Sequence, residues 1–443
     1  MALGGGSFTG QNKVLPGAYI NFVSTAASAV MGQRGTAALA LELDWGPEGA
    51  LFTLESGTAD SLAPSLLGYQ LSDPAVLAVH EAVKRAEKLL LYRVNGGGVK
   101  ASCTVGGLEA EALYSGTRGN SLKVAVLEGE EGMVEVVTYL DGQAVDSQTV
   151  SAAGGGGALT ANGFVAFSGG ESLTPTAATP LTGGTNGTGA SQGYTDWLAA
   201  LETASFQTLG YPGDDESVKE QVCRFVDRMR QEEGKKITGV VYNYPAADSM
   251  GILSVKNGVV LSDGTTVPGE TAVAWVAGAT AAAQVNESLT NDTYDGAVDV
   301  DVRYTKSQYE AAVEGGEFVF YADGSAARVL CDINTLTTFG GGVSRDWTSN
   351  QVVRVMDGWA NDVAAAFSQS YLGRQINSAT GRALFKADLI ALAAQYEALD
   401  AIGEFSADDI TVEQGSDKGD VVVTCLLQPN DSMEKLYMTV TVQ

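Results

Sequence analysis

An α/β pattern that is interrupted by a long all-β stretch constrains the fold more than any other feature of this 443-residue sequence. Residues 31–95 place apolar strand patterns beside amphipathic helix patterns, and residues 190–340 resume the same order. A strand–helix–strand order predicts parallel strands covered by the connecting helices. The two parts are therefore predicted to form one α/β domain that residues 96–189 divide in sequence.

The interrupting segment has the residue pattern of antiparallel strands. It opens at Gly96-Gly97-Gly98, and apolar and polar residues alternate in runs from Val99 to Phe167. Asp141-Gly142 lies between two such runs and predicts a hairpin. A stretch rich in Thr, Pro and Gly, from Leu173 to Gly189, is predicted to be a linker. Residues 96–189 are thus expected to form an inserted β-sandwich or barrel-like domain with its linker.

The last hundred residues predict a domain of helices and strands. Apolar residues recur at threes and fours over 357–372 and 380–401, as in amphipathic helices. A strand pattern over 420–428 follows, and Pro429-Asn430-Asp431 ends it. We therefore expect an α+β C-terminal domain over residues 341–430.

Strand patterns also occur at both ends of the sequence, in an expected N-terminal arm over 1–30 and a C-terminal arm over 431–443. A strand must pair its backbone groups with a partner. The last pattern, 435–443, either completes the sheet of its own domain or, like the first pattern at 18–23, adds to the sheet of a neighbouring subunit. Exchange of both ends would join copies into a lattice. The residues expected to pair between subunits are Tyr19, Ile20, Asn21, Phe22, Val23, Leu436, Tyr437, Met438, Thr439, Val440, Thr441 and Val442.

The charge of the chain excludes several classes of partner. The sequence has 26 lysines and arginines against 53 aspartates and glutamates, a formal net charge of −27. Nucleic-acid-binding proteins normally present a basic face, and an anionic membrane repels so acidic a chain. The longest nearly apolar run, 271–283, is shorter than the ~20 residues that a membrane helix needs. The N-terminus has no signal-peptide pattern, so we expect synthesis in the cytoplasm and no direct membrane insertion.

The sequence offers few residues for metal or acid–base chemistry. The four cysteines form no CxxC pair, and His80 is the only histidine. No Walker A, GxGxxG, GxSxG or HExxH motif occurs. The acidic segment 291–296 is similar to the start of a calcium loop, but the twelfth position is Val302 instead of glutamate. We therefore expect no catalytic residue, cofactor or metal, and we expect His80 and the cysteines to be structural.

Five segments, in order along the chain, are similar to segments of one protein family. They are Asn12–Phe22, Tyr114–Val124, Ala274–Gly278, Tyr371–Arg374 with Asn377 and Gly381-Arg382, and Asp431–Tyr437. In that order they resemble the N-terminal arm, the β-insertion, a helix of the α/β domain, the C-terminal domain and the C-terminal arm of contractile tail sheath proteins. The resemblance covers nearly the whole chain, and it is greatest to the sheaths of phages, prophages and phage-tail-like particles of Gram-positive type.

The resemblance implies a structural subunit of a contractile injection system. Sheath subunits of this family form hexameric rings that stack helically around an inner tube, and the terminal arms of one subunit join a sheet in the C-terminal domain of neighbours. The C-terminal domain faces the tube, and the β-insertion lies towards the outside. Contraction drives the tube through a target cell envelope without nucleotide hydrolysis. The implied partners are the inner tail tube, baseplate and tail terminator proteins of a virion tail or phage-tail-like particle that assembles in the host bacterial cytoplasm.

Three basic residues lie around the start of a C-terminal helix in this otherwise acidic chain. Arg374, Arg382 and Lys386 are predicted to contact an acidic surface of the inner tube and to set the register of the sheath on it. The alternative is that these residues only balance nearby acids.

Two other classes of protein remain as alternatives. One is a secreted β-rich adhesin or surface-layer subunit, against which the missing signal-peptide pattern argues. The other is an α/β hydrolase that uses paired carboxylates such as Asp408-Asp409, against which the missing nucleophile motif argues. Electron microscopy separates the three classes, because only a sheath is expected to form wide hollow helical tubes.

Overall fold

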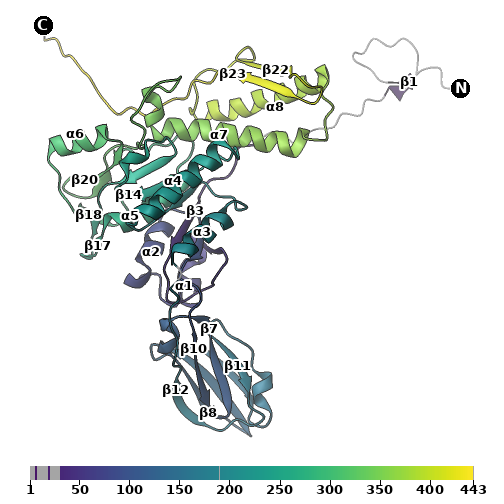
Figure 1. The fold of residues 1–443 in the computed structure, drawn as a ribbon, viewed down its shortest axis with the longest axis vertical. Coiled ribbons are helices and arrows are strands. Elements are labelled where there is room, and N and C mark those ends of the chain that lie inside the picture. Colours follow the sequence, from purple (N-terminus) through teal and green to yellow (C-terminus); the bar gives the residue numbers. More distant parts are fainter. Residues whose placement is uncertain (1–4, 7–17, 20–29, 189, 443) are drawn as a thin grey trace. The chain divides into compact units, whose positions relative to one another are not determined.

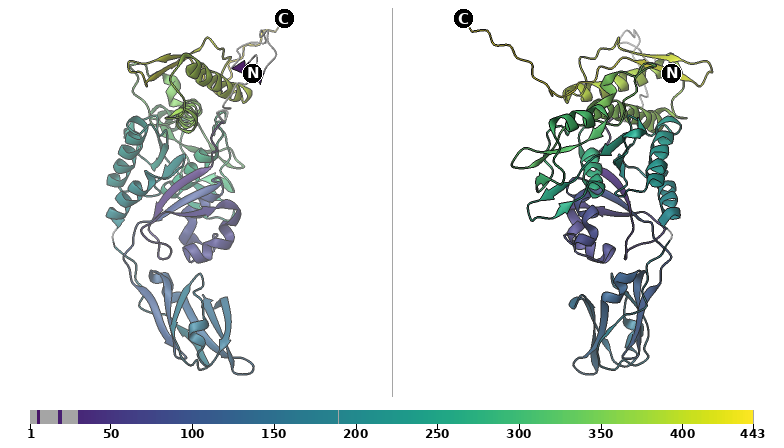
Figure 2. Two further views of the ribbon diagram at one scale, coloured as in Figure 1. Left: turned by 90° about the vertical axis from the view of Figure 1, so that its right-hand side faces the viewer. Right: turned by 60° about the vertical axis from the view of Figure 1, so that its left-hand side comes forward.

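The computed structural model describes residues 5–6, 18–19, 30–188 and 190–442. The chain forms two compact units, which Figures 1 and 2 colour along the sequence. We call residues 33–358 with 430–443 the central unit, and residues 359–429 with the chain up to residue 32 the C-terminal unit.

A seven-stranded sheet forms the middle of the central unit, in the order β19-β15-β14-β13-β3-β5-β4. Figure 1 labels β3 and β14 of this sheet. Its strands are β3 (Thr36–Leu41), β4 (Phe52–Glu55), β5 (Lys88–Arg93), β13 (Thr208–Gly210), β14 (Thr238–Tyr242), β15 (Ile252–Val255) and β19 (Glu317–Phe318). All neighbours are parallel except β4 and β5. Because β13 pairs with β3, the two separated parts of the sequence share one sheet. The predicted parallel α/β domain is confirmed.

Helices cover both faces of this sheet. One apolar core contains residues of α1 (Ala59–Leu67), α2 (Leu77–Val83) and α5 (Gly269–Ala282), and the other contains residues of α3 (Ala190–Leu201) and α4 (Glu216–Gln231). At Gly278 of α5 a Cβ would come within 2.5 Å of the backbone oxygen of Ala82 in α2. Glycine at this position therefore permits the close approach of α2 and α5.

The inserted segment is a β-sandwich, drawn in Figures 1 and 2. Its two antiparallel sheets have the strand orders β10-β9-β8-β12 and β11-β7-β6. Its strands are β6 (Lys100–Val105), β7 (Leu108–Ser115), β8 (Leu122–Glu128), β9 (Met133–Leu140), β10 (Gln143–Ser151), β11 (Val165–Gly169) and β12 (Thr176–Pro180). The predicted hairpin joins β9 to β10, with φ of 51° at Asp141 and 83° at Gly142. Positive φ at both turn residues is typical of a type I′ turn.

The predicted linker from Leu173 to Gly189 is wrong in part, because it contains β12. This edge strand pairs with β8 and is rich in Thr and Ala, with no alternation of large apolar residues. Its last residue is Pro180, and proline is tolerated in sheets mainly at edge strands. A composition that is typical of loops therefore concealed a strand at the edge of the sandwich.

Smaller elements complete the central unit. One sheet contains β16 (Val259–Leu261), β17 (Thr266–Val267) and β18 (Ala297–Val300). Another contains β20 (Phe320–Ala322) and β21 (Ala327–Val329). Helix α6 spans Lys306–Glu314.

The C-terminal unit contains helices and a β-hairpin. Helix α7 (Asn350–Ala366) begins in the central unit, seven residues before the predicted helix, continues into the C-terminal unit and is followed by a π-helical turn at Phe367–Tyr371. Helix α8 (Ala379–Ala398) follows, and its Phe385 and Leu389 pack against the hairpin of β22 (Ile410–Gln414) and β23 (Val421–Cys425). The predicted α+β composition is confirmed, although β22 was not predicted.

Candidate assembly site

The hairpin of β22 and β23 leaves two strand edges open. The two strands pair with each other from Ile410–Cys425 to Gln414–Val421, and neither pairs with a third strand within the described residues. On one face of the hairpin Ile410 is fully buried, whereas Val422 on the opposite face of the hairpin is exposed. Two strands alone are marginally stable, and open edges present unpaired N–H and C=O groups. The hairpin is therefore a template to which further strands can add.

The C-terminal segment carries a strand pattern but pairs with no strand of the described chain. Leu436, Met438, Val440 and Val442 alternate with polar or aromatic residues, and their exposed fractions lie between 71% and 89%. A strand needs a partner for its backbone groups, and no strand of the described residues pairs with the segment. Within the described residues, the strand expected over 431–443 is therefore an extended segment without a paired strand.

Two hydrogen bonds hold the beginning of this segment on the central unit. Ser349 Oγ donates to Asp431 Oδ1 at 3.0 Å, and Thr290 Oγ1 donates to Glu434 Oε1 at 2.7 Å. Beyond Glu434 the chain extends away from the helices and strands to the end marked C in Figure 1. Eight extended residues reach roughly 26 Å, which is the length of chain that is available for pairing with another molecule.

The N-terminal residues expected to pair between subunits lie mostly outside the described residues. Tyr19 belongs to the short strand β2 (Ala18–Tyr19), which pairs in parallel with β1 (Gly5–Gly6). Ile20, Asn21, Phe22 and Val23 are not among the described residues.

In the part of the chain that the structure describes, the predicted basic residues form no direct ion pair. Arg374 Nη1 donates to the backbone oxygen of Gln369 at 2.6 Å, and Arg382 Nη1 donates to Asn377 Oδ1 at 2.9 Å. Within the described residues, no carboxylate oxygen lies within 4.0 Å of Arg374, Arg382 or Lys386. The three charges are therefore not neutralised by direct ion pairs in the described chain.

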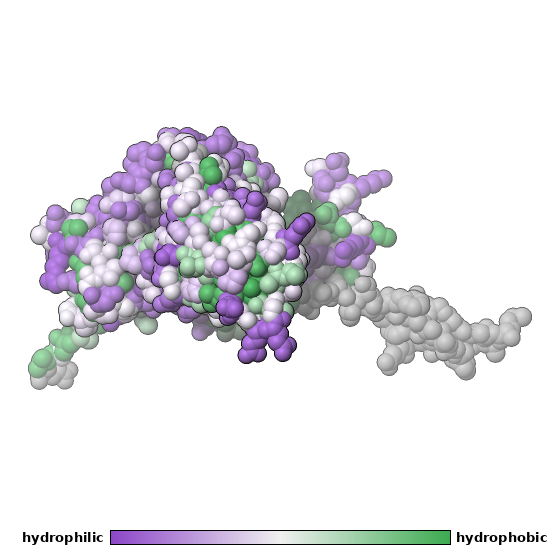
Figure 3. All heavy atoms as spheres, turned by 90° about the horizontal axis from the view of Figure 1, so that it is seen from below, coloured by the Kyte–Doolittle hydropathy of each residue, from purple (hydrophilic) through white to green (hydrophobic). Residues whose placement is uncertain are grey.

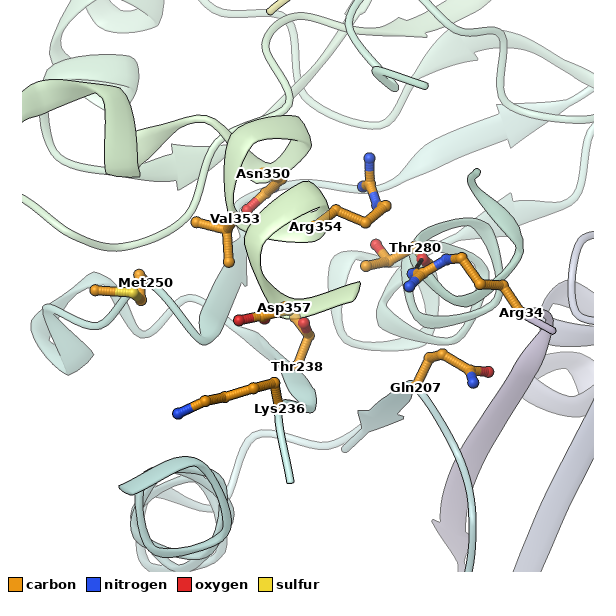
Figure 4. Close-up of a pocket in the computed structure, with 10 residues that line it drawn as sticks. All are labelled: Arg34, Gln207, Lys236, Thr238, Met250, Thr280, Asn350, Val353, Arg354 and Asp357. Carbon is orange, nitrogen blue, oxygen red and sulfur yellow. Dashed lines mark hydrogen bonds between the residues drawn. The ribbon is translucent and has the colours of Figure 1, made fainter. Parts of the chain in front are cut away.

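A small polar cavity lies in the central unit, lined by α5, the first turns of α7 and the start of β14 (Figure 4). Its volume of about 20 Å³ has room for one water molecule. The charged groups on its wall have partners. Arg354 pairs with Asp332 at 3.3 Å, and Asp357 pairs with Arg230 at 2.5 Å. Arg34 donates to two backbone carbonyls, and Lys236 Nζ donates to the backbone oxygen of Arg230 at 2.5 Å. This pairing indicates a structural role for the cavity, which is too small for a substrate.

The cysteines have the environment of structural thiols. Burial raises the pKa of the Cys223 thiol to about 12 and that of the Cys331 and Cys425 thiols to about 11. Burial also raises the pKa of the Cys103 thiol. These thiols stay protonated at neutral pH, and a protonated thiol is a poor nucleophile and metal ligand.

The acidic segment that resembles a calcium loop binds an arginine. Arg85 pairs with Asp292 at 2.9 Å and also with Asp295. His80 lies beside Glu81, with 3.6 Å between Nδ1 and Oε1. The described residues contain no cluster of three or more His, Cys, Asp or Glu side chains that could hold a metal ion. In the same part of the chain, no helix is both long enough and apolar enough to cross a bilayer.

A divided α/β domain, an inserted β-sandwich and an α+β unit with open strand edges define a multidomain structural protein. Four domain families match this chain in consecutive parts. They are the Tail sheath protein Gp18 domain III N-terminal region over residues 34–94, the Phage tail sheath protein beta-sandwich domain over 96–186, the Phage tail sheath protein central domain over 187–335 and the Phage tail sheath C-terminal domain over 343–443. The chain therefore belongs to the phage tail sheath protein family, whose members are structural proteins of virion tails and phage-tail-like particles.

Individual relatives agree with this assignment. The crystal structure of a sheath tail protein from Desulfitobacterium hafniense is 43% identical, covers 96% of this chain and 99% of its own, and has a TM-score of 0.84. The phage-like element PBSX protein XkdK of Bacillus subtilis is 35% identical over 99% of this chain and 100% of its own length. The helical sheath of the anti-feeding prophage in its contracted state is 13% identical, with a TM-score of 0.59 over 97% of this chain and 99% of its own. That last likeness shows a shared fold.

Proposed function

We propose that this chain polymerises as stacked hexameric rings around an inner tail tube and contracts to drive the tube through a target cell envelope. The observation that carries the proposal is an unpaired apolar strand segment and an open-edged hairpin in one chain. The segment needs a partner strand, and the hairpin needs further strands, so copies of the chain can satisfy each other. Assembly takes place in the host bacterial cytoplasm with the tube, baseplate and tail terminator proteins.

The strands exchanged in this proposal are those that the sequence predicts. Tyr19–Val23 of one subunit and Leu436–Val442 of another add to the β22–β23 hairpin of a third. Main-chain hydrogen bonds supply affinity in such strand addition, and alternate side chains supply specificity. When each subunit has both a donor strand and an acceptor edge, repeated contacts give a closed ring if the rotation between subunits closes and a helical filament if it does not.

Electron microscopy of the purified protein tests the proposal directly. We expect wide, hollow, helical tubes with six subunits in each ring. Flat two-dimensional arrays would support the surface-layer alternative instead. A protein that stays monomeric at every concentration and with added tubes would refute polymerisation.

The inserted β-sandwich is expected to be dispensable for polymerisation. Its ends adjoin, because a Cβ on Gly98 would lie 2.9 Å from the backbone nitrogen of Gly187. Trp45 of the α/β domain packs against Tyr114 and Phe164 in the sandwich, so its loss would expose this indole. We therefore predict that a variant with residues 99–186 replaced by a short Gly/Ser bridge, combined with Trp45→Ser, folds and forms tubes of smaller outer diameter.

Circular dichroism and negative-stain microscopy measure the two parts of this prediction. The single variant Trp45→Ser in the full chain is the control for the loss of the indole. A deletion variant that is folded but forms no polymer would show that the β-sandwich is part of the lattice.

Reversal of the three predicted tube-contact charges is expected to weaken sheath–tube association at least tenfold. The variant carries Arg374→Glu, Arg382→Glu and Lys386→Glu. Because electrostatic contacts at an interface govern association and register, tube binding should fall while tube-free sheath polymers persist. Co-sedimentation with assembled tubes at several salt concentrations measures the effect, which salt should diminish. Wild-type binding by the triple variant would contradict the tube contact.

A further inference from the structure

The lysine and arginine side chains of the C-terminal unit differ from those of the central unit in whether they form ion pairs. Many cations of the central unit form ion pairs, such as Arg85 with Asp292. In the C-terminal unit, no carboxylate oxygen of the described residues lies within 4.0 Å of Lys418. The same is true of Arg374, Arg382 and Lys386. These four are all the lysines and arginines from residue 359 to 429. An unpaired basic group in so acidic a chain favours an anionic partner.

An apolar pocket opens beside these cations. Its volume is about 100 Å³, and the rings of Phe367, Tyr371 and Phe385 form much of its wall. Arg382 and Gly419 also line it. Cavities of this order with apolar walls bind small apolar groups, so the pocket has the size and chemistry for one aliphatic side chain.

The rim of the pocket exposes large apolar side chains. Leu372 is 61% exposed and Ile376 is 78% exposed, and both lie in the loop between the π-helical turn and α8. Exposed apolar groups that adjoin a pocket are typical of protein–protein contacts, whereas scattered single ones need no explanation.

Hydrogen bonds hold this rim in place before any partner binds. Asn377 Nδ2 donates to the backbone oxygens of Lys418 at 3.0 Å and Asp420 at 2.7 Å, while its Oδ1 accepts from Arg382. Tyr371 on the wall donates its hydroxyl to Asp388 at 2.5 Å. A rim that is already ordered loses little conformational entropy on binding. The same bonds bring the loop of Lys418 to the loop that precedes α8.

We propose that this pocket receives one aliphatic side chain of the inner tail tube protein, while carboxylates around that side chain face Arg374, Arg382, Lys386 and Lys418. The inference rests on the proposed function. It adds an apolar contact and a fourth cation to the surface of this chain that is predicted to contact the tube. The exchanged segment Leu436–Val442 of another subunit fits less well, because it contains no charged side chain to match the four cations.

The test uses the full chain and assembled tubes of the inner tube protein from the same particle. Gly419→Leu places a side chain at the pocket without a backbone clash, because no atom lies within 4 Å of the position of its Cβ. Gly57→Leu is the matched control, since its Cβ position is equally open and lies outside the pocket. The measured quantity is the sheath concentration at which half of the tubes are sheathed. We expect Gly419→Leu to raise it at least tenfold and Gly57→Leu to leave it unchanged.

Two more variants separate the apolar contact from the charge. Ile376→Ser removes an exposed rim side chain and should raise the half-sheathing concentration at least threefold, even if Gly419→Leu folds poorly. Lys418→Glu should raise it at low salt, and added salt should reduce the difference from wild type. Wild-type sheathing by all three variants would overturn the inference while leaving polymerisation intact.

Tube-free polymers distinguish the remaining outcomes. Loss of tube-free polymers by a folded Gly419→Leu variant would show that the pocket receives another sheath subunit, which also overturns the inference. Failure of the wild-type protein to polymerise, with or without tubes, would instead refute the proposed function itself.

Discussion

A variant that lacks residues 432–443 should be a folded, soluble monomer that forms no tubes. The deletion removes the apolar face from Leu436 to Val442, whose side chains are 71–89% exposed, so the cores of both units lose little packing. Each cross-strand pair contributes only roughly 0.2–1 kcal/mol, but every subunit of a polymer would lose the same pairs. Circular dichroism measures the fold, and sedimentation velocity measures the assembly.

The two faces of the segment provide a test variant and a matched control variant. Leu436→Ser with Val440→Ser should abolish tubes as the deletion does, because both residues lie on the apolar face. Thr439→Ser with Thr441→Ser, on the other face, should preserve them. A peptide of residues 432–443 should occupy the vacated edge, because main-chain pairing drives strand addition. Loss of the folded circular dichroism spectrum on deletion would reject arm exchange in favour of a strand that completes its own domain.

Local patterns in the sequence predicted the parts of the fold that local interactions determine. Asp141-Gly142 predicted a hairpin because both residues tolerate positive φ, and the structure has φ of 51° and 83° there. The parallel order of β13 and β14 was predictable because α4 separates them in sequence. These features need only the residues within one strand–turn–strand or strand–helix–strand unit.

Strands that depend on distant partners were harder to predict. β12 contains Thr, Ala and Pro without large apolar residues, and only its pairing with β8 makes it a strand. β22 was missed, although Ile410 is fully buried against α8 and β23 pairs along its length. The start of α7 at Asn350 was also missed, because its buried polar side chains interrupt the apolar pattern of the helix.

The candidate site was also predictable only in the part that local sequence determines. Arg374, Arg382 and Lys386 lie near each other in sequence, whereas Lys418 joins them only through the hydrogen bonds of Asn377. The pocket of Phe367, Tyr371 and Phe385 likewise requires the π-helical turn to meet α8. Tertiary contacts of this kind leave no mark on local residue spacing.

Removal of the Arg354 guanidinium is expected to cause the largest loss of stability of any single substitution considered. Arg354 and Asp332 form an ion pair of 3.3 Å, and their side chains are 3% and 1% exposed. Asp332 also accepts hydrogen bonds from the backbone N–H of Leu289 at 3.0 Å and from Asn350 Nδ2 at 2.8 Å, while Arg354 donates to the backbone oxygen of Glu287. The pair therefore joins the first turn of α7 to the loop before β18.

Arg354→Met would leave the carboxylate of Asp332 buried without a countercharge, which typically costs about 3–5 kcal/mol of unfolding free energy. Hydrogen exchange at the amide of Leu289 measures the local effect, because this N–H is bonded to Asp332. Arg224→Met is the control, since its ion pair with Glu220 is exposed and should be worth about 0.5 kcal/mol or less. Adding Asp332→Asn to Arg354→Met removes the unpaired charge while keeping an acceptor, so part of the stability should return. Equal losses in Arg354→Met and the double variant would show that packing of the arginine stem, and not its charge, stabilises this junction.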